Sequence, residues 1–169
     1  DIFAMGARPI ALLNSLRFGL PDSDRNRYLF GGVVAGIADY GNCIGIPNIG
    51  GEVVFAEEYS DNPLINAMCI GLIEDGQVVS ASPERAGDVL LLVGADTGRD
   101  GIHGASGLAS RTFEEEAGLR SAVQVGNPFL EKVLIEACLE AAKLDAVVGM
   151  QDLGAAGLTS AAIEAAERA

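Results

Sequence analysis

The sequence predicts an α/β fold, and three observations support this class. Of the 169 residues, 49% are hydrophobic, which is enough to form the core of one large domain or parts of two small ones. Glycine is abundant, with 22 residues, and small residues let helices lie close to sheets. Short apolar runs alternate with longer segments of helical periodicity. This apolar content excludes a disordered chain.

The first elements follow from the apolar pattern and its breaks. Residues 1–5 are expected to form the last turn of a helix that ends at Gly6. Residues 8–18 form a predicted strand. A turn with a potential helix cap at 21–24 leads into a predicted helix over 25–41, whose apolar side chains share one face.

The next segments complete the first part of the chain. Gly45 to Gly51 is predicted to be a loop, because it combines proline, asparagine and adjacent glycines. Strands are predicted at 52–56 and 64–74, and the second is apolar enough to be buried on both faces. Residues 75–87 are polar and rich in turn formers, so we expect a domain boundary near residue 82. The predicted domains are residues 1–82 and 83–169.

The second part repeats the alternation of strands and helices. Short buried strands are predicted at 88–94 and 145–150. The Asn-Pro pair at 127–128 predicts the start of a helix over 129–142, with asparagine as the cap and proline in the first turn. Residues 151–160 are predicted to be a turn that leads into a final helix.

Charge and cysteine usage restrict the class of protein. The net charge of -13 argues against nucleic-acid binding, because such a field repels phosphate backbones. Three cysteines without metal-ligand spacing indicate buried thiols in a reducing compartment, and we expect a cytoplasmic protein. The sequence shows no membrane-spanning run and no signal peptide. Both ends are typical of a chain cut from a longer protein.

The residues alone give several candidate sites, each with a structural alternative. The glycine-rich segment 94–107 is suited to cradling phosphate, or is a structured surface loop. His103, the only histidine, lies within it as a potential base or a locally bonded imidazole. Asp152 follows a predicted strand and is either a Mg²⁺ ligand or a helix cap. Glu52 follows two glycines and faces either a ligand or solvent, and the polar residues at 14–17 indicate a cavity or an interface.

Eight motifs, in order and spread over nearly the whole chain, point to one family. They cover residues 1–10, 14–19, 36–47, 50–53, 62–69, 97–105, 121–126 and 151–159. Together they resemble the synthetase subunit of phosphoribosylformylglycinamidine synthase. The resemblance implies the last part of an N-terminal domain like that of aminoimidazole ribonucleotide synthetase, followed by the start of the C-terminal-like domain. In this superfamily the first domain pairs with a second copy, which would explain the polar residues on strand 8–18.

The implied activity is that of a ligase in purine biosynthesis. Formylglycinamide ribonucleotide, ATP and ammonia give formylglycinamidine ribonucleotide, ADP and phosphate. The resemblance further implies Mg²⁺, a glutaminase subunit that supplies the ammonia from glutamine, and a small assembly subunit. Neither nucleic acid nor membrane is an expected partner.

The family's functional residues carry over at three positions of this sequence. Asp1 and Asp152 match Mg²⁺ ligands, and Gln124 matches a contact to the ribonucleotide substrate. The family's catalytic histidines and an ATP-contacting lysine lie upstream of Asp1, so no catalytic residue is assigned within the chain. We therefore expect the chain to be inactive alone. One departure, at residues 106–108, where an aromatic residue is expected, puts the shape of that loop in doubt.

Two alternatives remain open at this point. The chain could belong to another ATP-using member of the superfamily, such as aminoimidazole ribonucleotide synthetase, selenophosphate synthetase or thiamine monophosphate kinase. The motifs at 97–105 and 151–159 favour the first interpretation. The isolated chain could also be a non-catalytic assembly module.

Overall fold

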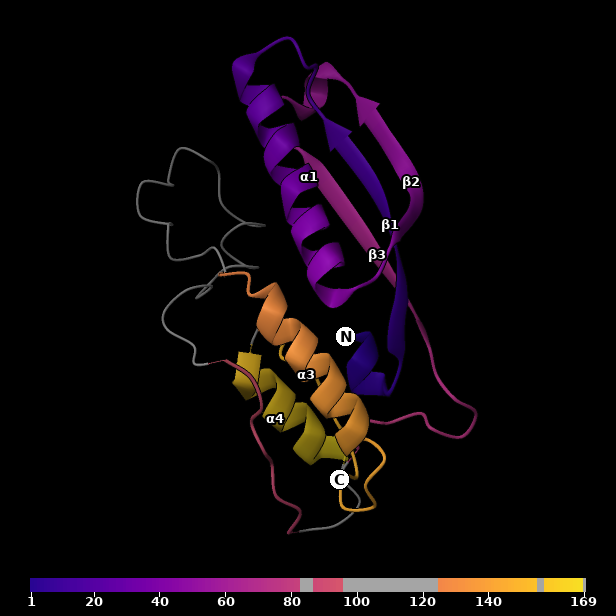
Figure 1. Cartoon of the computed structure of the whole chain (residues 1–169). Coiled ribbons are helices and arrows are strands. Elements are labelled where there is room, and N and C mark those ends of the chain that lie inside the picture. The colour runs from indigo at the N-terminus through magenta and orange to yellow at the C-terminus, as the bar shows by residue number, and fades with distance from the viewer. Residues whose placement is uncertain (83–86, 96–124, 155–156, 169) are drawn as a thin grey trace.

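The computed structural model describes residues 1–82, 87–95, 125–154 and 157–168. It confirms the α/β class, with a small mixed sheet, one helix on that sheet, and two further helices beyond its end (Figure 1). The elements are η1 (Ile2–Met5), β1 (Arg8–Phe18), α1 (Asp24–Ile44), β2 (Asn48–Phe55), η2 (Glu57–Tyr59), β3 (Leu64–Leu72), α3 (Pro128–Ala141) and α4 (Gly157–Arg168).

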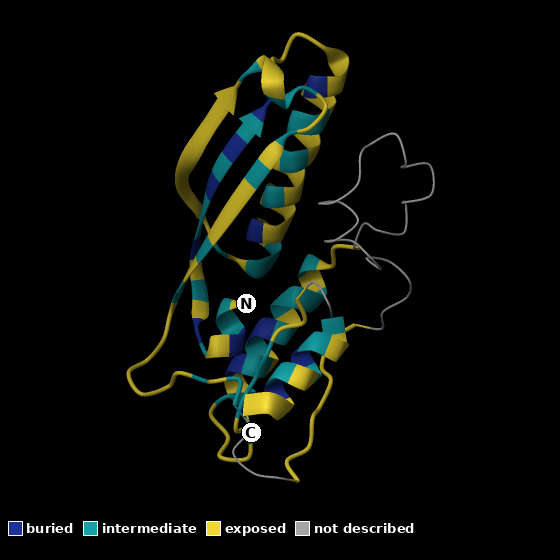
Figure 2. Ribbon diagram, turned by 180° about the vertical axis from the view of Figure 1, so that it is seen from behind, coloured by how far each residue is buried: buried dark blue, intermediate teal, exposed yellow. Residues whose placement is uncertain are grey.

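The sheet has the order β2-β1-β3, so β1 is its central strand. β1 runs parallel to β2, from which α1 separates it in the chain, and antiparallel to β3. Helix α1 lies on one face of the sheet, and no described element covers the other, which is called the open face (Figures 1 and 2). β3 was predicted to be buried on both faces, and this is wrong, since most of its residues are exposed. An edge strand with one open face keeps its apolar side chains half in solvent.

An aromatic cluster joins α1 to the sheet. Phe18 at the end of β1 is 1% exposed and is the largest fully buried side chain among the described residues. Its ring centroid lies 5.0 Å from that of Phe30 on α1, in an edge-to-face arrangement, and 6.2 Å from that of Phe55 on β2. Such pairs add to the stabilisation from apolar burial. The cluster therefore fixes α1 over the β1–β2 half of the sheet.

Gly51 allows β2 to approach β1 closely. Its φ is +137°, and a Cβ atom at this position would lie 1.9 Å from the backbone oxygen of Asn14. A side chain there would collide with backbone, which cannot move aside without opening the sheet. The close neighbour of this glycine, one of the two that precede Glu52, is therefore strand β1.

Local capping signals explain where α1 begins and ends. The Ser23 hydroxyl accepts a hydrogen bond from the backbone N–H of Asn26 at 3.1 Å, as an N-cap does. Gly45 ends the helix in the left-handed conformation. The helix is longer at both ends than the predicted range 25–41. Its internal glycines do not interrupt it, although each weakens helix propensity.

Helix α3 packs against the first part of the molecule. The Asn127 side chain caps it by accepting from the backbone N–H of Leu130 at 3.0 Å, which confirms the predicted start. Ile135 and Leu139 are its buried residues. The helix contacts both η1 and α1, so it lies where the start of the chain meets the end of α1 (Figure 1).

Three predictions of strand structure need correction. Residues 88–94 and 145–150 were predicted to be buried strands, but neither contains a strand; residues 88–94 are exposed, and in 145–150 no residue is buried. A strand needs a ladder of backbone hydrogen bonds to a neighbour. Residues 88–94 pair with no strand among the described residues, and 145–150 has a single bond, from Met150 to Ser80, to the segment that follows β3. β2 begins at Asn48, inside the predicted loop, because pairing with Leu12 and Leu13 extends it.

Candidate functional site

Asp1 lies at the edge of a cavity between the two parts of the molecule. Its backbone oxygen accepts a hydrogen bond from the N–H of Ala4 at 3.2 Å, and its exposed side chain makes no capping bond. The cavity has a volume of about 500 Å³ and lies between η1, β1, α1 and α3. Asn14, Tyr40 and Glu131 contribute polar groups to its lining. The Asp1 carboxylate is therefore free to bind a cation.

Polar residues of β1 divide between the two faces of the sheet. Asn14 faces the cavity, is 5% exposed, and its Nδ2 atom has no hydrogen-bond partner within the described residues. Ser15 lies opposite Glu52 in the sheet register and donates a hydrogen bond to its Oε1 atom at 3.0 Å. Arg17 donates to the same oxygen at 2.5 Å. The cavity interpretation of residues 14–17 is thus supported for Asn14, while Ser15 and Arg17 bind Glu52 on the opposite face, and the interface stays a prediction.

Glu52 is held by these two partners. Its carboxylate forms an ion pair with Arg17, and the hydrogen bonds from Arg17 and then Ser15 lower the pKa of Glu52 below its ordinary value. The carboxylate is therefore ionised and paired on the open face of the sheet. This position is remote from the cavity lining that contains Asp1.

Asp152 lies in the connection between residue 150 and α4. The backbone N–H of Met150 donates to the Ser80 oxygen at 3.3 Å, which ties this connection to the segment that follows β3. Asp152 itself is exposed, and no hydrogen bond to its side chain occurs among the described residues. The N-cap alternative for this carboxylate receives no support, since α4 begins five residues later, at Gly157.

A polar network joins the residue before Asp152 to α4. The Gln151 Nε2 atom donates to Glu164 Oε2 at 3.0 Å, and the Ser160 hydroxyl donates to Glu164 Oε1 at 3.1 Å. Arg168 donates to Gln151 Oε1 at 3.4 Å and lies 3.5 Å from Glu164. The hydrogen bonds from Gln151 and Ser160 lower the pKa of Glu164, while the charge of Asp152 acts in the opposite direction. Glu164 is thus an ionised acceptor near Asp152.

A second network links β1 to α3. Arg8 donates to both carboxylate oxygens of Glu136, at 2.9 and 2.8 Å, and Lys132 donates to Oε1 at 2.5 Å. The Arg8 hydrogen bond, followed by that of Lys132, lowers the pKa of Glu136 to about 2. The side chains are about half exposed, so each pair alone contributes little to stability. The bidentate geometry nevertheless fixes the orientation of α3 on the strand that follows η1.

The donor set is compatible with Mg²⁺. This ion is often held by one or two carboxylates, with water and substrate phosphates completing its shell. Asp1 and Asp152 both offer exposed carboxylates. They do not form part of a cluster of three or more potential metal ligands within the described ranges. The remaining oxygens would have to come from water, substrate or residues elsewhere.

Several sequence-based candidates cannot be placed. Gln124, His103 and residues 96–107 of the glycine-rich segment lie outside the described residues. The Glu164 network was missed by the sequence analysis. Its signal is the four-residue spacing of Ser160, Glu164 and Arg168, which places their side chains on one stripe of a helix. In the described part of the chain, no helix has both the length and the apolar character that a membrane crossing requires.

Comparison with protein families gives two matches that cover most of the chain. Residues 1–73 match the N-terminal domain of AIR synthase related proteins, and residues 85–169 match their C-terminal domain. Among curated proteins, the chain is 58% identical over 168 residues to the phosphoribosylformylglycinamidine synthase subunit PurL of Thermoanaerobacter sp. strain X514. The same identity holds for the PurL subunit of Caldanaerobacter subterraneus. The chain spans 23% of the length of each of these relatives.

Solved structures show the same similarity in three dimensions. Thermotoga maritima PurL complexed with FGAR has a TM-score of 0.85 and 43% identity, over 99% of this chain and 27% of that one. The ATP complex of the same protein has a TM-score of 0.77 and 38% identity, over 99% of this chain and 24% of that one. A structure of PurLQS from the same organism has a TM-score of 0.78. At these identities the likeness extends beyond fold to sequence.

Proposed function

The chain belongs to the AIR synthase related proteins, and from this we propose that it forms part of the synthetase subunit of phosphoribosylformylglycinamidine synthase. The observation that carries the proposal is the 58% identity to PurL subunits over 99% of the chain. The similarity to Thermotoga maritima PurL complexed with FGAR and with ATP supports the substrates. Because the chain spans only part of these relatives, the activity is assigned to the parent protein.

The proposed reaction replaces an amide oxygen by nitrogen. ATP transfers its γ-phosphoryl group to the amide oxygen of formylglycinamide ribonucleotide, which gives ADP and an imidate-like phosphate ester. Ammonia attacks the activated carbon, the C–O bond breaks, and phosphate leaves with the former amide oxygen. The product is formylglycinamidine ribonucleotide. The demand on the protein is to position the two substrates and to stabilise the charge on the transferred phosphoryl group.

Three residues of this chain receive roles in that reaction. Asp1 and Asp152 would hold Mg²⁺, which is supported by their exposed carboxylates. Bound Mg²⁺ supplies neutralisation of phosphate charge. Gln124 would bind the ribonucleotide, where an amide side chain can donate to and accept from polar substrate groups. We assign no catalytic acid or base within the chain.

The proposal also includes partner subunits, a division into two domains and a cellular location. A glutaminase subunit would supply ammonia and a small subunit would assist assembly, for which the PurLQS structure of a similar protein is the support. The division into two domains near residue 82 is supported by family matches that end at residue 73 and resume at residue 85. A cytoplasmic location fits three free cysteines, which persist in reducing compartments.

The test is an assay of the full-length parent protein with ammonia, Mg·ATP and formylglycinamide ribonucleotide. We expect ADP release that depends on both ammonia and the ribonucleotide, and formation of the amidine product by mass spectrometry. The isolated 169-residue chain should show no turnover. ADP release that responds instead to the substrates of aminoimidazole ribonucleotide synthetase, selenophosphate synthetase or thiamine monophosphate kinase would reject the proposal.

A further inference from the structure

The connection that carries Asp152 is joined to α4 by side-chain hydrogen bonds of Gln151. Gln151, the residue before Asp152, bonds through its amide to both Glu164 and Arg168. Glu164 in turn accepts from Ser160, one helical turn earlier. Ser160, Glu164 and Arg168 are four residues apart and share one stripe of the helix. Glu164 and Arg168 bond to Gln151 directly, and Ser160 supports Glu164.

We propose that Glu164 is a positioning residue, which acts through Gln151 to hold the Asp152 carboxylate in place for a divalent cation. This inference rests on the proposed function, because it takes Asp152 as a metal ligand. Glu164 contacts neither substrate nor metal in this account. Its role is to anchor the backbone of the residue next to the ligand.

The arrangement favours a carboxylate at position 164. Its two oxygens accept from two different donors, Oε2 from Gln151 and Oε1 from Ser160. A glutamine side chain has one acceptor oxygen and one donor group, so it can preserve only one of these bonds in the same geometry. A change from glutamate to glutamine therefore releases part of the network with almost no change in volume.

The charges of Glu164, Asp152 and Arg168 also support a positioning role for Glu164. Hydrogen bonds from Gln151 and Ser160 keep Glu164 ionised, although the nearby charge of Asp152 opposes this. Two carboxylates of like charge are thus held near one another by a network whose only cation is Arg168, among the described residues. The effect of Asp152 on Glu164 places the two carboxylates near one another, which fits a network that positions Asp152.

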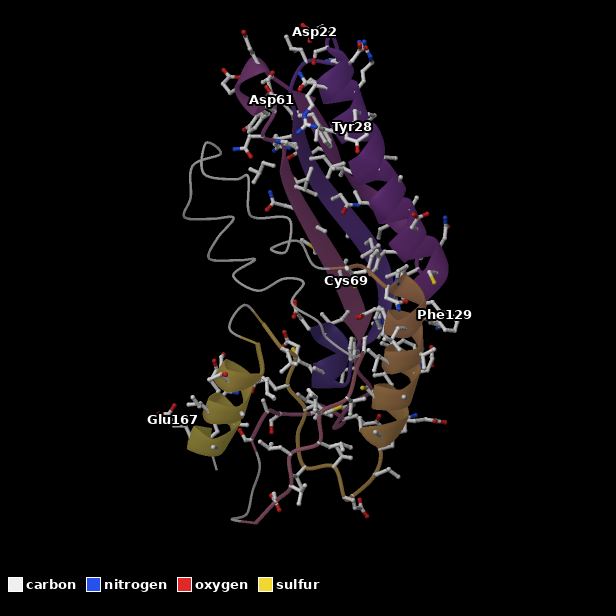
Figure 3. All side chains as sticks on the ribbon, turned by 90° about the vertical axis from the view of Figure 1, so that its left-hand side faces the viewer. Asp22, Tyr28, Asp61, Cys69, Phe129 and Glu167 are labelled. Carbon is white, nitrogen blue, oxygen red and sulfur yellow. The ribbon has the colours of Figure 1, made fainter. Side chains whose placement is uncertain are left out.

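Glu167 provides a matched control on the same helix. It is exposed, it points away from the rest of the molecule in Figure 3, and its side chain forms no hydrogen bond or ion pair with any described residue. Glu164→Gln and Glu167→Gln therefore remove the same charge from α4 but only the first alters the contact to Gln151.

The experiment measures Mn²⁺ binding to the full-length synthetase by electron paramagnetic resonance, in the presence of ATP and without ammonia. For Glu164→Gln we expect the dissociation constant of Mn²⁺ to rise about tenfold, the lower end for residues that orient a metal ligand. Glu167→Gln should bind Mn²⁺ as the unmodified enzyme does. In steady-state assays, Glu164→Gln should raise the Mg²⁺ requirement while kcat at saturating Mg²⁺ stays within about twofold.

Two further variants, Ser160→Ala and Asp152→Asn, distinguish an error in the role of Glu164 from an error in the metal assignment of Asp152. Ser160→Ala removes one hydrogen bond to Glu164 and, like Glu164→Gln, should raise the dissociation constant of Mn²⁺. If Glu164→Gln does not fold, Ser160→Ala still tests the positioning role. Unchanged Mn²⁺ affinity in both Glu164→Gln and Ser160→Ala would overturn the positioning role. If Asp152→Asn also leaves Mn²⁺ affinity unchanged, the metal assignment itself is wrong; if Asp152→Asn alone weakens binding, only the role of Glu164 is rejected.

Discussion

Strand β1 and residues 88–93 are both of strand length and mostly apolar, but they lie in different environments. β1 has a hydrogen-bonded neighbour on each side, and Leu16 and Phe18 within it are 6% and 1% exposed. In residues 88–93, Val89 and Leu91 are 89% and 84% exposed, and no strand pairs with this segment in the described part of the chain. Apolar composition is therefore not sufficient for strand structure; paired neighbours are also required.

The largest expected effect on the free energy of unfolding comes from the aromatic cluster at the end of β1, and it tests whether β1 belongs to the core. Phe18→Ala removes a fully buried ring that packs against Phe30 and Phe55, and should lower the free energy of unfolding by about 3–5 kcal/mol. Phe129→Ala, at a position 70% exposed, is the control and should change it by less than about 0.5 kcal/mol. Urea denaturation of the 169-residue chain, followed by circular dichroism, measures both. Equal losses would mean that the β1 cluster is not the core.

The same substitution in both regions tests the comparison directly. Leu16→Ala in β1 should lower the free energy of unfolding by about 2–3 kcal/mol, because it leaves a cavity among packed side chains. Leu91→Ala should change it by less than about 0.5 kcal/mol, because its side chain is 84% exposed. A large loss for Leu91→Ala would show that residues 88–93 are packed in solution and would break the comparison.

Two adjacent glycines test how β1 gains its parallel neighbour. Gly51→Ala should lower the free energy of unfolding by about 2 kcal/mol or more, since the new Cβ atom meets the Asn14 oxygen and φ is positive. In Gly50→Ala the new Cβ atom would lie 3.7 Å from Leu13 Cδ2, an ordinary contact, so little change is expected. Denaturant midpoints of the two variants give the comparison. A milder effect at position 51 than at 50 would contradict the described pairing.

The smallest expected effect concerns the link between β1 and α3, which holds the start of the central strand. Glu136 has a pKa of about 2 in the folded chain, below its ordinary value of 4.5, because of Arg8 and Lys132. Its contribution is therefore complete above pH 4.5 and is lost as the pH falls from 4.5 toward 2. We expect Glu136→Gln to cost at most about 1 kcal/mol at neutral pH and to reduce the loss of stability in that pH range.

The measurement for this link is the thermal midpoint as a function of pH. Glu140→Gln is the control, since this residue is on the same helix and its carboxylate forms no hydrogen bond or ion pair within the described ranges. The control should retain the acid dependence of the unmodified chain. Identical pH profiles for Glu136→Gln and Glu140→Gln would show that the bidentate pair does not persist in solution.

Sequence reasoning succeeded where the determining signal is local. β1 was predicted with its observed bounds, 8–18, and the Asn127–Pro128 start of α3 was correct, because propensity and capping depend on nearby residues. It failed at 88–94 and 145–150, since strand formation there depends on partners that no local pattern reveals. It also could not foresee that Gly51 serves strand pairing, because that contact joins residues far apart in the chain.

The candidate site was predictable only in part. Asp152 was a candidate from its position after a predicted strand, with a helix cap as the alternative, and the family resemblance favoured the metal role. Asp1 and Gln124 came from the resemblance alone. The structure shows that Asp1 and Asp152 are exposed, and their metal role stays a prediction. The Gln151–Glu164 bond was not foreseen, since it joins side chains 13 residues apart, one before α4 and one within it.

The central position of β1 has a consequence for synthesis on the ribosome. Both neighbours of β1 follow it in the chain, and Leu64, which pairs with Arg17, is made about fifty residues later, which takes roughly 2–10 s. During this interval one edge of β1 has no partner, and the segment from β1 to β2 can close only the parallel pair. A nascent chain that pauses within η2 would therefore expose Leu12, Leu13 and Leu16 on a free strand edge, where a chaperone could bind it.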